Sequence, residues 1–186
     1  PADVLGMTPS NNHSYKVQVF TWNIGNCTPN QVHPSWFLDA DSYDSDIIVI
    51  GLQEVLDLES TSQHALKLLS NGDELPDGAH HTWKQYLEML FVPNGFELVV
   101  MKPLVGLMSC LFIKQELMPY VSDVSAYVAR TGIGGTYGNK GGVVFGFTLT
   151  GMKWSLINCH LAAGHSSFVQ RNRDATYIME SSDILH

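Results

Sequence analysis

Residues 131–149 read TGIGGTYGNKGGVVFGFTL, and residues 154–174 continue as WSLINCHLAAGHSSFVQRNRD. Six glycines lie between Gly132 and Gly142. This density of glycine lets the backbone take positive φ angles and approach a ligand closely. Lys140 lies among these glycines as a mobile cation, so the loop has the composition of an anion-binding segment.

Two apolar runs follow this glycine-rich loop, over residues 142–148 and 154–158. Both are rich in β-branched and aromatic residues, and both predict β-strands. The second run delivers His160 to its carboxyl end. A cationic loop beside a strand-end imidazole predicts a phosphate-binding site.

Five short motifs occur in a fixed order along the chain. They are FTWNIGN at 20–26, IGLQEV at 50–55, GNKGG at 138–142, NCHLAAG at 158–164 and RNRD at 171–174. Together they resemble the inositol polyphosphate 5-phosphatases of the endonuclease/exonuclease/phosphatase superfamily. Five collinear motifs make a specific match, whereas a single glycine-rich loop would be a weak one.

The resemblance implies an α/β fold, a two-layer β-sandwich flanked by helices as in deoxyribonuclease. The family completes its site with an Asp-x-Asn and a later Ser-Asp-His, and neither motif occurs in this sequence. Residues 1–186 are therefore interpreted as the first half to two-thirds of one phosphatase catalytic domain, with residues 1–14 as a lead-in segment. We expect this portion alone to be inactive.

The charge of the chain is unevenly distributed. Its formal net charge is −8, yet residues 130–186 hold five Lys/Arg against three Asp/Glu, while residues 1–129 hold five against fifteen. A local field steers an anionic ligand more than the total charge does. Binding to nucleic acid needs a broad basic face and is not expected.

The composition, with 45% hydrophobic and 15% charged residues, is that of a globular domain. No apolar run is long enough to span a membrane, and the first residues lack the pattern of a secretory signal. Cys27, Cys110 and Cys159 are odd in number and widely spaced, which favours reduced thiols. We expect a cytoplasmic protein, with recruitment to membranes as an open alternative.

Residues 15–22 alternate apolar and polar side chains and predict a first strand that ends at Asn23. The residue type alone favours an asparagine that caps a turn. Residues 46–52 form a continuous apolar run, which predicts a strand buried on both faces and followed by Glu54. A carboxylate at that position needs a positive partner, either a structural Lys or Arg or a metal ion.

Caps and apolar spacing predict helices at residues 35–40, 60–71, 80–91 and 166–185. His80 and His81 begin the third of these helices. Adjacent residues on a helix point in different directions, and no further ligand follows at metal-binding spacing. Both histidines are therefore expected at the surface.

Residues 95–101 and 106–114 predict a hairpin, and residues 120–129 predict a further strand. Around the turn of this hairpin, residues 104–108 are more apolar than an edge requires. The ordinary explanation is core packing, which we favour. The resemblance offers an alternative, namely contact with the acyl chains or membrane surface of a lipid substrate.

The resemblance also implies the roles of individual residues. His160 and Asn23 are the expected catalytic residues, with His160 hydrogen-bonding the phosphate that is removed. Glu54 is the expected ligand of Mg²⁺, the implied cofactor. The expected substrate-binding residues are Lys140, Asn139, Tyr137 and Arg171; for Arg171 a structural role has equal weight.

The leading hypothesis is a Mg²⁺-dependent phosphomonoesterase that removes the 5-phosphate from inositol polyphosphates or from phosphoinositides such as phosphatidylinositol 4,5-bisphosphate. Peripheral membrane contact would accompany a lipid substrate. One alternative is a metal-dependent nuclease of the same superfamily, which the GNKGG loop and the acidic first part disfavour. Another is a non-catalytic fragment that retains phosphate recognition.

Overall fold

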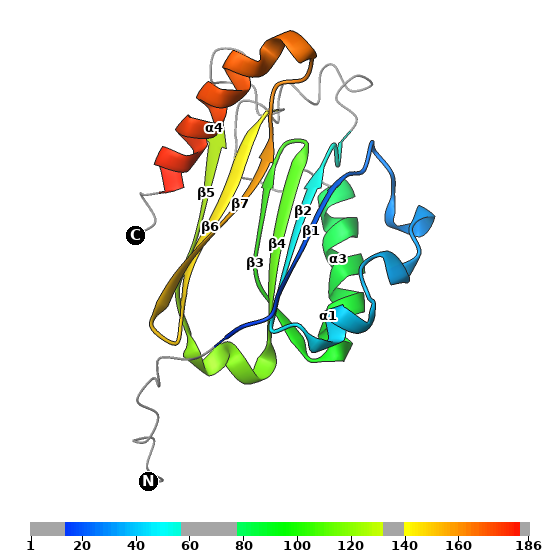
Figure 1. Ribbon diagram of the computed structural model, residues 1–186. Helices are drawn as coiled ribbons and strands as arrows, with labels where there is room; N and C mark the ends of the chain where they lie inside the picture. Colours follow the sequence, from blue (N-terminus) through cyan, green and yellow to red (C-terminus); the bar gives the residue numbers. More distant parts are fainter. Residues whose placement is uncertain (1–13, 57–77, 132–139, 183–186) are drawn as a thin grey trace.

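Two β-sheets pack face to face in the computed structural model, which describes residues 14–56, 78–131 and 140–182 (Figure 1). The first sheet has the order β1-β2-β4-β3, formed by Val17–Asn23, Ile47–Gln53, Leu107–Lys114 and Phe96–Leu104. The second has the order β5-β6-β7, formed by Val121–Arg130, Gly141–Leu149 and Met152–His160. This confirms the expected two-layer α/β sandwich.

Strand β2 is buried along its whole length, as its apolar run predicts. Its alternate side chains enter two different cores. Ile48, Ile50 and Leu52 face α3 (Ala79–Phe91), whereas Ile47 and Val49 pack against the second sheet. Strand β1 pairs with β2 in parallel, so both strands end at the same edge of the sandwich.

The β3–β4 hairpin has its turn at Val105 and Gly106, so β3 extends three residues beyond the predicted strand end at Met101. Leu104, Val105, Leu107 and Met108 are all buried. The structure thus supports core packing for this apolar segment. Strands β5, β6 and β7 form an antiparallel meander, and the glycine-rich loop between β5 and β6 lies outside the described residues.

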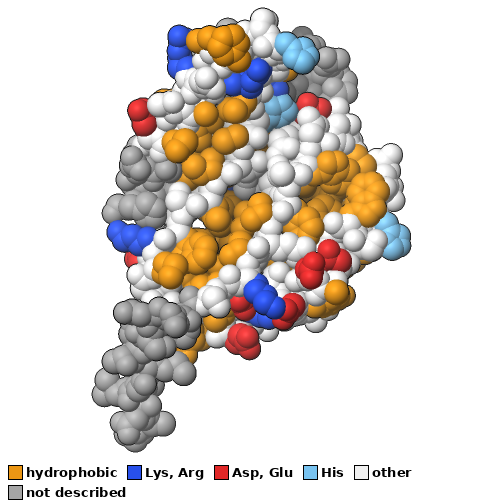
Figure 2. All heavy atoms as spheres, viewed as in Figure 1, with side chains coloured by type: hydrophobic (Ala, Val, Ile, Leu, Met, Phe, Trp, Pro, Cys, Tyr) orange, Lys and Arg blue, Asp and Glu red, His pale blue; other side chains and the backbone are white. Residues whose placement is uncertain are grey.

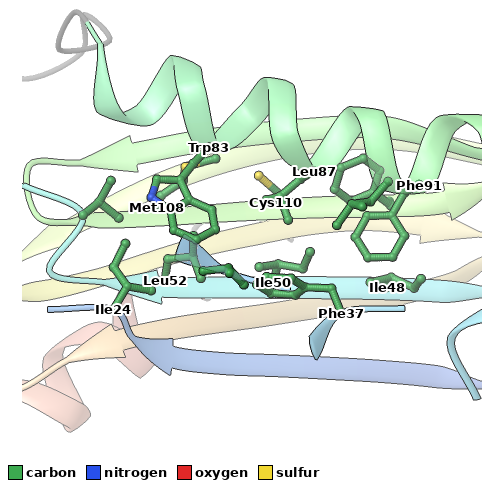
Figure 3. Packing of buried hydrophobic residues seen from close by; sticks show 14 of the residues in the cluster. Ile24, Phe37, Ile48, Ile50, Leu52, Trp83, Leu87, Phe91, Met108 and Cys110 are labelled. Atoms are coloured by element: carbon green, nitrogen blue, oxygen red, sulfur yellow. The ribbon is translucent and has the colours of Figure 1, made fainter. Parts of the chain in front are cut away.

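Helix α3 covers the outer face of the first sheet (Figure 1). Figure 3 shows Trp83, Leu87 and Phe91 pointing from this helix toward β2 and β4. Helix α4 (Phe168–Ser182) packs on β5 and β6 of the second sheet, where Ile178 is fully buried. None of the helices in the described ranges is long and apolar enough to cross a membrane.

The shorter elements differ from their predicted bounds. In place of a helix at 35–40, the chain forms the 3-10 turn η2 (Pro34–Trp36) and the helix α1 (Ala40–Asp44), which Asp39 caps through its side chain. The other 3-10 turns in the described residues are η1 (Pro29–Gln31), η3 (Val92–Asn94), η4 (Gln115–Tyr120) and η6 (His165–Ser167). The helix predicted at 60–71 lies outside the described residues.

The predicted surface position of His80 is wrong. Its side chain is fully buried between α3 and the β3–β4 hairpin, and its Nε2 atom lies 3.3 Å from the carbonyl oxygen of Leu107. Burial lowers the pKa of His80 to about 4, so the imidazole is neutral at neutral pH. The neutral ring is accommodated because this hydrogen bond satisfies one of its nitrogens. His81, in contrast, is exposed as expected.

Candidate active site

The carboxyl ends of β1, β2 and β7 meet at one edge of the sandwich, at the upper end in Figure 1. A hydrogen bond joins the two sheets here: Nε2 of Gln53 on β2 donates to Oδ1 of Asn158 on β7, at 2.8 Å. Gln53 Nε2 is also 3.1 Å from Oγ1 of Thr21 on β1. Asn158 in turn donates through Nδ2 to the carbonyl oxygen of Met108, at 3.3 Å. This network fixes the relative positions of β1, β2, β4 and β7 just below the site.

Gly51 makes this close approach of the two sheets possible. A Cβ atom at position 51 would lie 2.6 Å from Cγ of Asn158, which is shorter than any normal contact. Gln53 and Asn158 were not among the residues predicted for the site. The sequence did contain a hint of their role. Each is a polar residue within an apolar strand, Gln53 directly before Glu54 and Asn158 two residues before His160.

Glu54 follows β2 directly and has a left-handed backbone, with φ of 55°. Neighbouring turns hold this conformation: the amide of Asn26 donates to the Glu54 carbonyl at 2.8 Å, and the amide of Val55 donates to the Gly106 carbonyl at 2.9 Å. The Glu54 side chain retains 46% of its accessible surface. The carboxylate is therefore presented outward at the strand ends, where it can bind a cation.

His160 is the last residue of β7 and lies opposite Gly141, so the register brings Lys140 beside it. Lys140 Nζ donates a hydrogen bond to Nε2 of His160. The same Nε2 atom is 3.9 Å from Oε1 of Glu54. An ammonium group, an imidazole and a carboxylate therefore converge, as a phosphate and metal site requires.

The surroundings of His160 disfavour the protonated imidazole. Burial, and then the charge of Lys140, lower the pKa of His160, while Glu54 opposes the shift. Burial also lowers the pKa of Lys140, again against the effect of Glu54. Nδ1 of His160 is buried and has no hydrogen-bond partner among the residues that the structure describes. With Nε2 accepting from Lys140, the proton of the neutral ring lies on Nδ1.

Asn23 lies at the end of β1 on the same edge and is exposed. Its Oδ1 atom accepts a hydrogen bond from the amide of Gly25 at 3.1 Å, the turn-capping arrangement that its residue type favours. The turn it stabilises leads to Asn26, whose amide holds the Glu54 carbonyl. Asn23 thus shapes the backbone around the predicted metal ligand.

Arg171 on α4 is directed toward the loop after β7. Its Nη1 atom donates to the carbonyl oxygens of Ala162 at 3.0 Å and Gly164 at 2.6 Å. These hydrogen bonds hold the loop after β7 against α4, which is the structural one of the two roles considered for Arg171. The predicted substrate-binding residues Tyr137 and Asn139 lie outside the described residues.

The model of the endonuclease/exonuclease/phosphatase family 2 matches residues 20–185. The chain belongs to this family. Among family members, a probable inositol polyphosphate 5-phosphatase of Schizosaccharomyces pombe is 29% identical over 94% of this chain and 16% of its own length. The human phosphatidylinositol 4,5-bisphosphate 5-phosphatase A is 32% identical over 86% of this chain and 15% of its own. These relatives confirm the resemblance to the inositol polyphosphate 5-phosphatases.

The fold is also that of a solved family structure. The inositol polyphosphate 5-phosphatase domain of a synaptojanin, in complex with inositol (1,4)-bisphosphate and a calcium ion, superposes with a TM-score of 0.70 at 23% identity. The match covers 88% of this chain and 45% of that domain. The chain thus spans less than half of that domain, and about one sixth of the two relatives named above.

The donor set of the site suits a hard divalent cation. Within the described ranges, no cluster of three or more His, Cys, Asp or Glu side chains forms a complete protein cage. Mg²⁺ does not need such a cage, because it binds through one or two carboxylates and completes its shell with water and substrate phosphate. The outward carboxylate of Glu54 fits this requirement.

Proposed function

We propose that this protein is a Mg²⁺-dependent phosphomonoesterase that removes the 5-phosphate from inositol polyphosphates or phosphoinositides such as phosphatidylinositol 4,5-bisphosphate. One observation carries the proposal: Glu54, Lys140 and His160 come from three separate segments and meet at the strand ends. The names of the relatives supply the substrate class.

The proposed metal ion would be held by Glu54, whose backbone carbonyl accepts from Asn26 at the end of the turn that Asn23 caps. When bound, it would supply Lewis-acid stabilisation of charge on the phosphate that is removed. His160 would donate to the phosphate from Nε2. In the structure Nε2 accepts from Lys140, so this role requires the tautomer with its proton on Nε2, which the ring can adopt once a bound phosphate draws the ammonium group of Lys140 away. That hydrogen bond would strengthen as charge builds up on the phosphate oxygens.

Lys140 has a binding role in this proposal. Its ammonium group has three donors and uses one of them on His160. A phosphate on the neighbouring ring carbon would attract the remaining donors. Lys140 would therefore favour substrates with two adjacent phosphates.

We further propose that the 186 residues are not sufficient for turnover. The resemblance implies an Asp-x-Asn and a Ser-Asp-His for activation of water and phosphate binding, and the sequence contains neither. The match to 45% of the solved domain supports this division of the site.

The proposed location is the cytoplasm, with recruitment to membranes that carry the substrate. Nucleic acid is not a proposed partner, because the net charge is −8.

The test is phosphate release by the 186-residue chain and by a chain extended past His186. Substrates are phosphatidylinositol 4,5-bisphosphate, inositol 1,4,5-trisphosphate and duplex DNA, each with Mg²⁺ or with a chelator. We expect only the extended chain to act, only with Mg²⁺, and only on the inositol substrates. Glu54→Gln should raise the Mg²⁺ concentration needed for half-maximal rate. Cleavage of DNA, or folded extended protein without phosphate release, would refute the proposal.

A further inference from the structure

Two exposed apolar side chains begin helix α4. Phe168 and Val169 are adjacent in sequence and retain 59% and 55% of their accessible surface. Burial of this adjacent pair against an apolar partner would remove its apolar surface from water and would be favourable. The hydrophobic, basic and histidine side chains at the top of Figure 2 lie side by side, at the end of the molecule where β7 leads into α4 (Figures 1 and 2).

The sequence around this apolar pair is basic, although the carboxylate of Glu54 faces His160 at the site and the buried Asp174 lies on α4. Residues 124–173 contain five Lys/Arg and no Asp or Glu, in a chain whose net charge is −8. Near the pair, His165 and Arg173 are exposed, and Lys140 and Arg171 lie toward the site. The first turn of α4 has no acidic residue. This combination suits an anionic surface with an apolar interior.

The position of the pair relative to the site is fixed. Only seven residues separate His160 at the end of β7 from Phe168. Arg171 donates to the carbonyls of Ala162 and Gly164 in this connection, and so ties the start of α4 to the loop after the imidazole. The hairpin segment 104–108 was considered above for lipid contact, but its apolar side chains are buried and cannot contact a lipid. The start of α4 offers the exposed apolar surface that the hairpin lacks.

We propose that Phe168 and Val169 form a membrane-docking surface, which inserts into the interface of a bilayer containing anionic phospholipid while Arg173 and His165 face the lipid headgroups. This proposal rests on the proposed function, because it gives that function its lipid-surface partner. Docking there holds the strand-end site against the bilayer, where the headgroup of a phosphoinositide can reach Lys140 and His160. Soluble substrates gain nothing from this surface.

The first test measures binding without turnover. The extended chain is sedimented with vesicles of phosphatidylcholine alone or with about 20% phosphatidylserine, and circular dichroism checks that each variant is folded. We expect binding to the anionic vesicles and a fall of about tenfold in the partition coefficient for the Phe168→Ser, Val169→Ser double variant. Met152→Ser is the matched control, because Met152 is 48% exposed but lies at the opposite end of β7. Equal binding of wild type and double variant would overturn the proposal.

The second test compares two substrates. For the double variant we expect kcat/KM to fall about tenfold on phosphatidylinositol 4,5-bisphosphate in vesicles, and to stay within about twofold of wild type on soluble inositol 1,4,5-trisphosphate. Equal losses on both substrates would show that the pair supports the site itself and would contradict membrane docking. A wild-type protein without activity on either substrate would refute the proposed function, while the vesicle result would still decide whether this surface binds lipid.

Discussion

Gln53 and Asn158 are 105 positions apart in sequence, and their side chains form a 2.8 Å hydrogen bond that joins the two sheets. Gln53 directly precedes Glu54, and Asn158 lies two residues before His160. The distance between the predicted metal ligand and the predicted catalytic histidine therefore depends on this bond. Both amides lie in a largely buried region, where an unmet hydrogen bond is costly.

A double-mutant cycle measures how much the hydrogen bond between Gln53 and Asn158 contributes to stability. Gln53→Ala and Asn158→Ala should each lower the free energy of unfolding by about 1–3 kcal/mol, because each leaves a buried partner unpaired. The double variant should lose less than the sum, with a coupling energy of about 1 kcal/mol or more in urea unfolding. The pair Lys84 and Glu88 on α3 is the control; it is partly exposed and should couple by less than about 0.5 kcal/mol. Equal coupling in the two cycles would contradict the inter-sheet role.

The close approach at Gly51 gives a second prediction. Gly51→Ala places a methyl group 2.6 Å from Cγ of Asn158 and should cost about 1–3 kcal/mol of stability. Asn158→Ala removes the Cγ atom with which the new methyl group would clash. In that background, Gly51→Ala should therefore lower the free energy of unfolding by clearly less. Thermal or urea unfolding of the four proteins gives the answer. Additive losses would mean that the strain arises elsewhere.

Buried His80 predicts the pH dependence of stability. Its folded pKa of about 4 lies below the ordinary value of 6.5, so the unfolded state binds a proton first as the pH falls. The contribution of neutral His80 is complete above pH 6.5 and is lost progressively down to about pH 4, by up to about 3 kcal/mol.

His80→Gln should flatten the decline of unfolding free energy between pH 6.5 and 4, because glutamine does not titrate. His81→Gln is the matched control, since its exposed neighbouring side chain should leave the slope unchanged. A slope that is the same in wild type and both variants would disprove the role of His80.

The elements that periodicity defines were predicted well from sequence. The continuous apolar run before Glu54 predicted the buried strand β2, and the apolar face of residues 80–91 predicted α3 to within one residue. These patterns depend on local spacing, which the sequence displays directly.

The remaining features depend on contacts between distant segments. His80 is buried because the β3–β4 hairpin supplies the carbonyl of Leu107, 27 positions away, and no local pattern reveals that partner. The Gln53–Asn158 bond was missed for the same reason. The site residues Lys140 and His160 were predicted through motifs, but their hydrogen bond follows from the register of β6 and β7.

Lys140 should discriminate between substrates. Lys140→Ala is expected to lower kcat/KM on phosphatidylinositol 4,5-bisphosphate by about 10- to 100-fold, the loss of one charge-assisted hydrogen bond. On phosphatidylinositol 5-phosphate, which lacks the neighbouring phosphate, the loss should be only a few-fold. Lys153→Ala serves as control, because Lys153 lies near the opposite end of β7. Equal losses on the two lipids would show that Lys140 does not recognise the neighbouring phosphate.

The imidazole at the end of β7 is proposed to take part in phosphate removal. This role is tested most directly by the kcat of His160→Ala in the extended chain, with saturating Mg²⁺ and phosphatidylinositol 4,5-bisphosphate, after circular dichroism has confirmed the fold. The predicted result is a fall in kcat of at least about 100-fold with a smaller change in KM, as expected for a group that stabilises charge in the transition state. A kcat within about threefold of wild type would contradict the account.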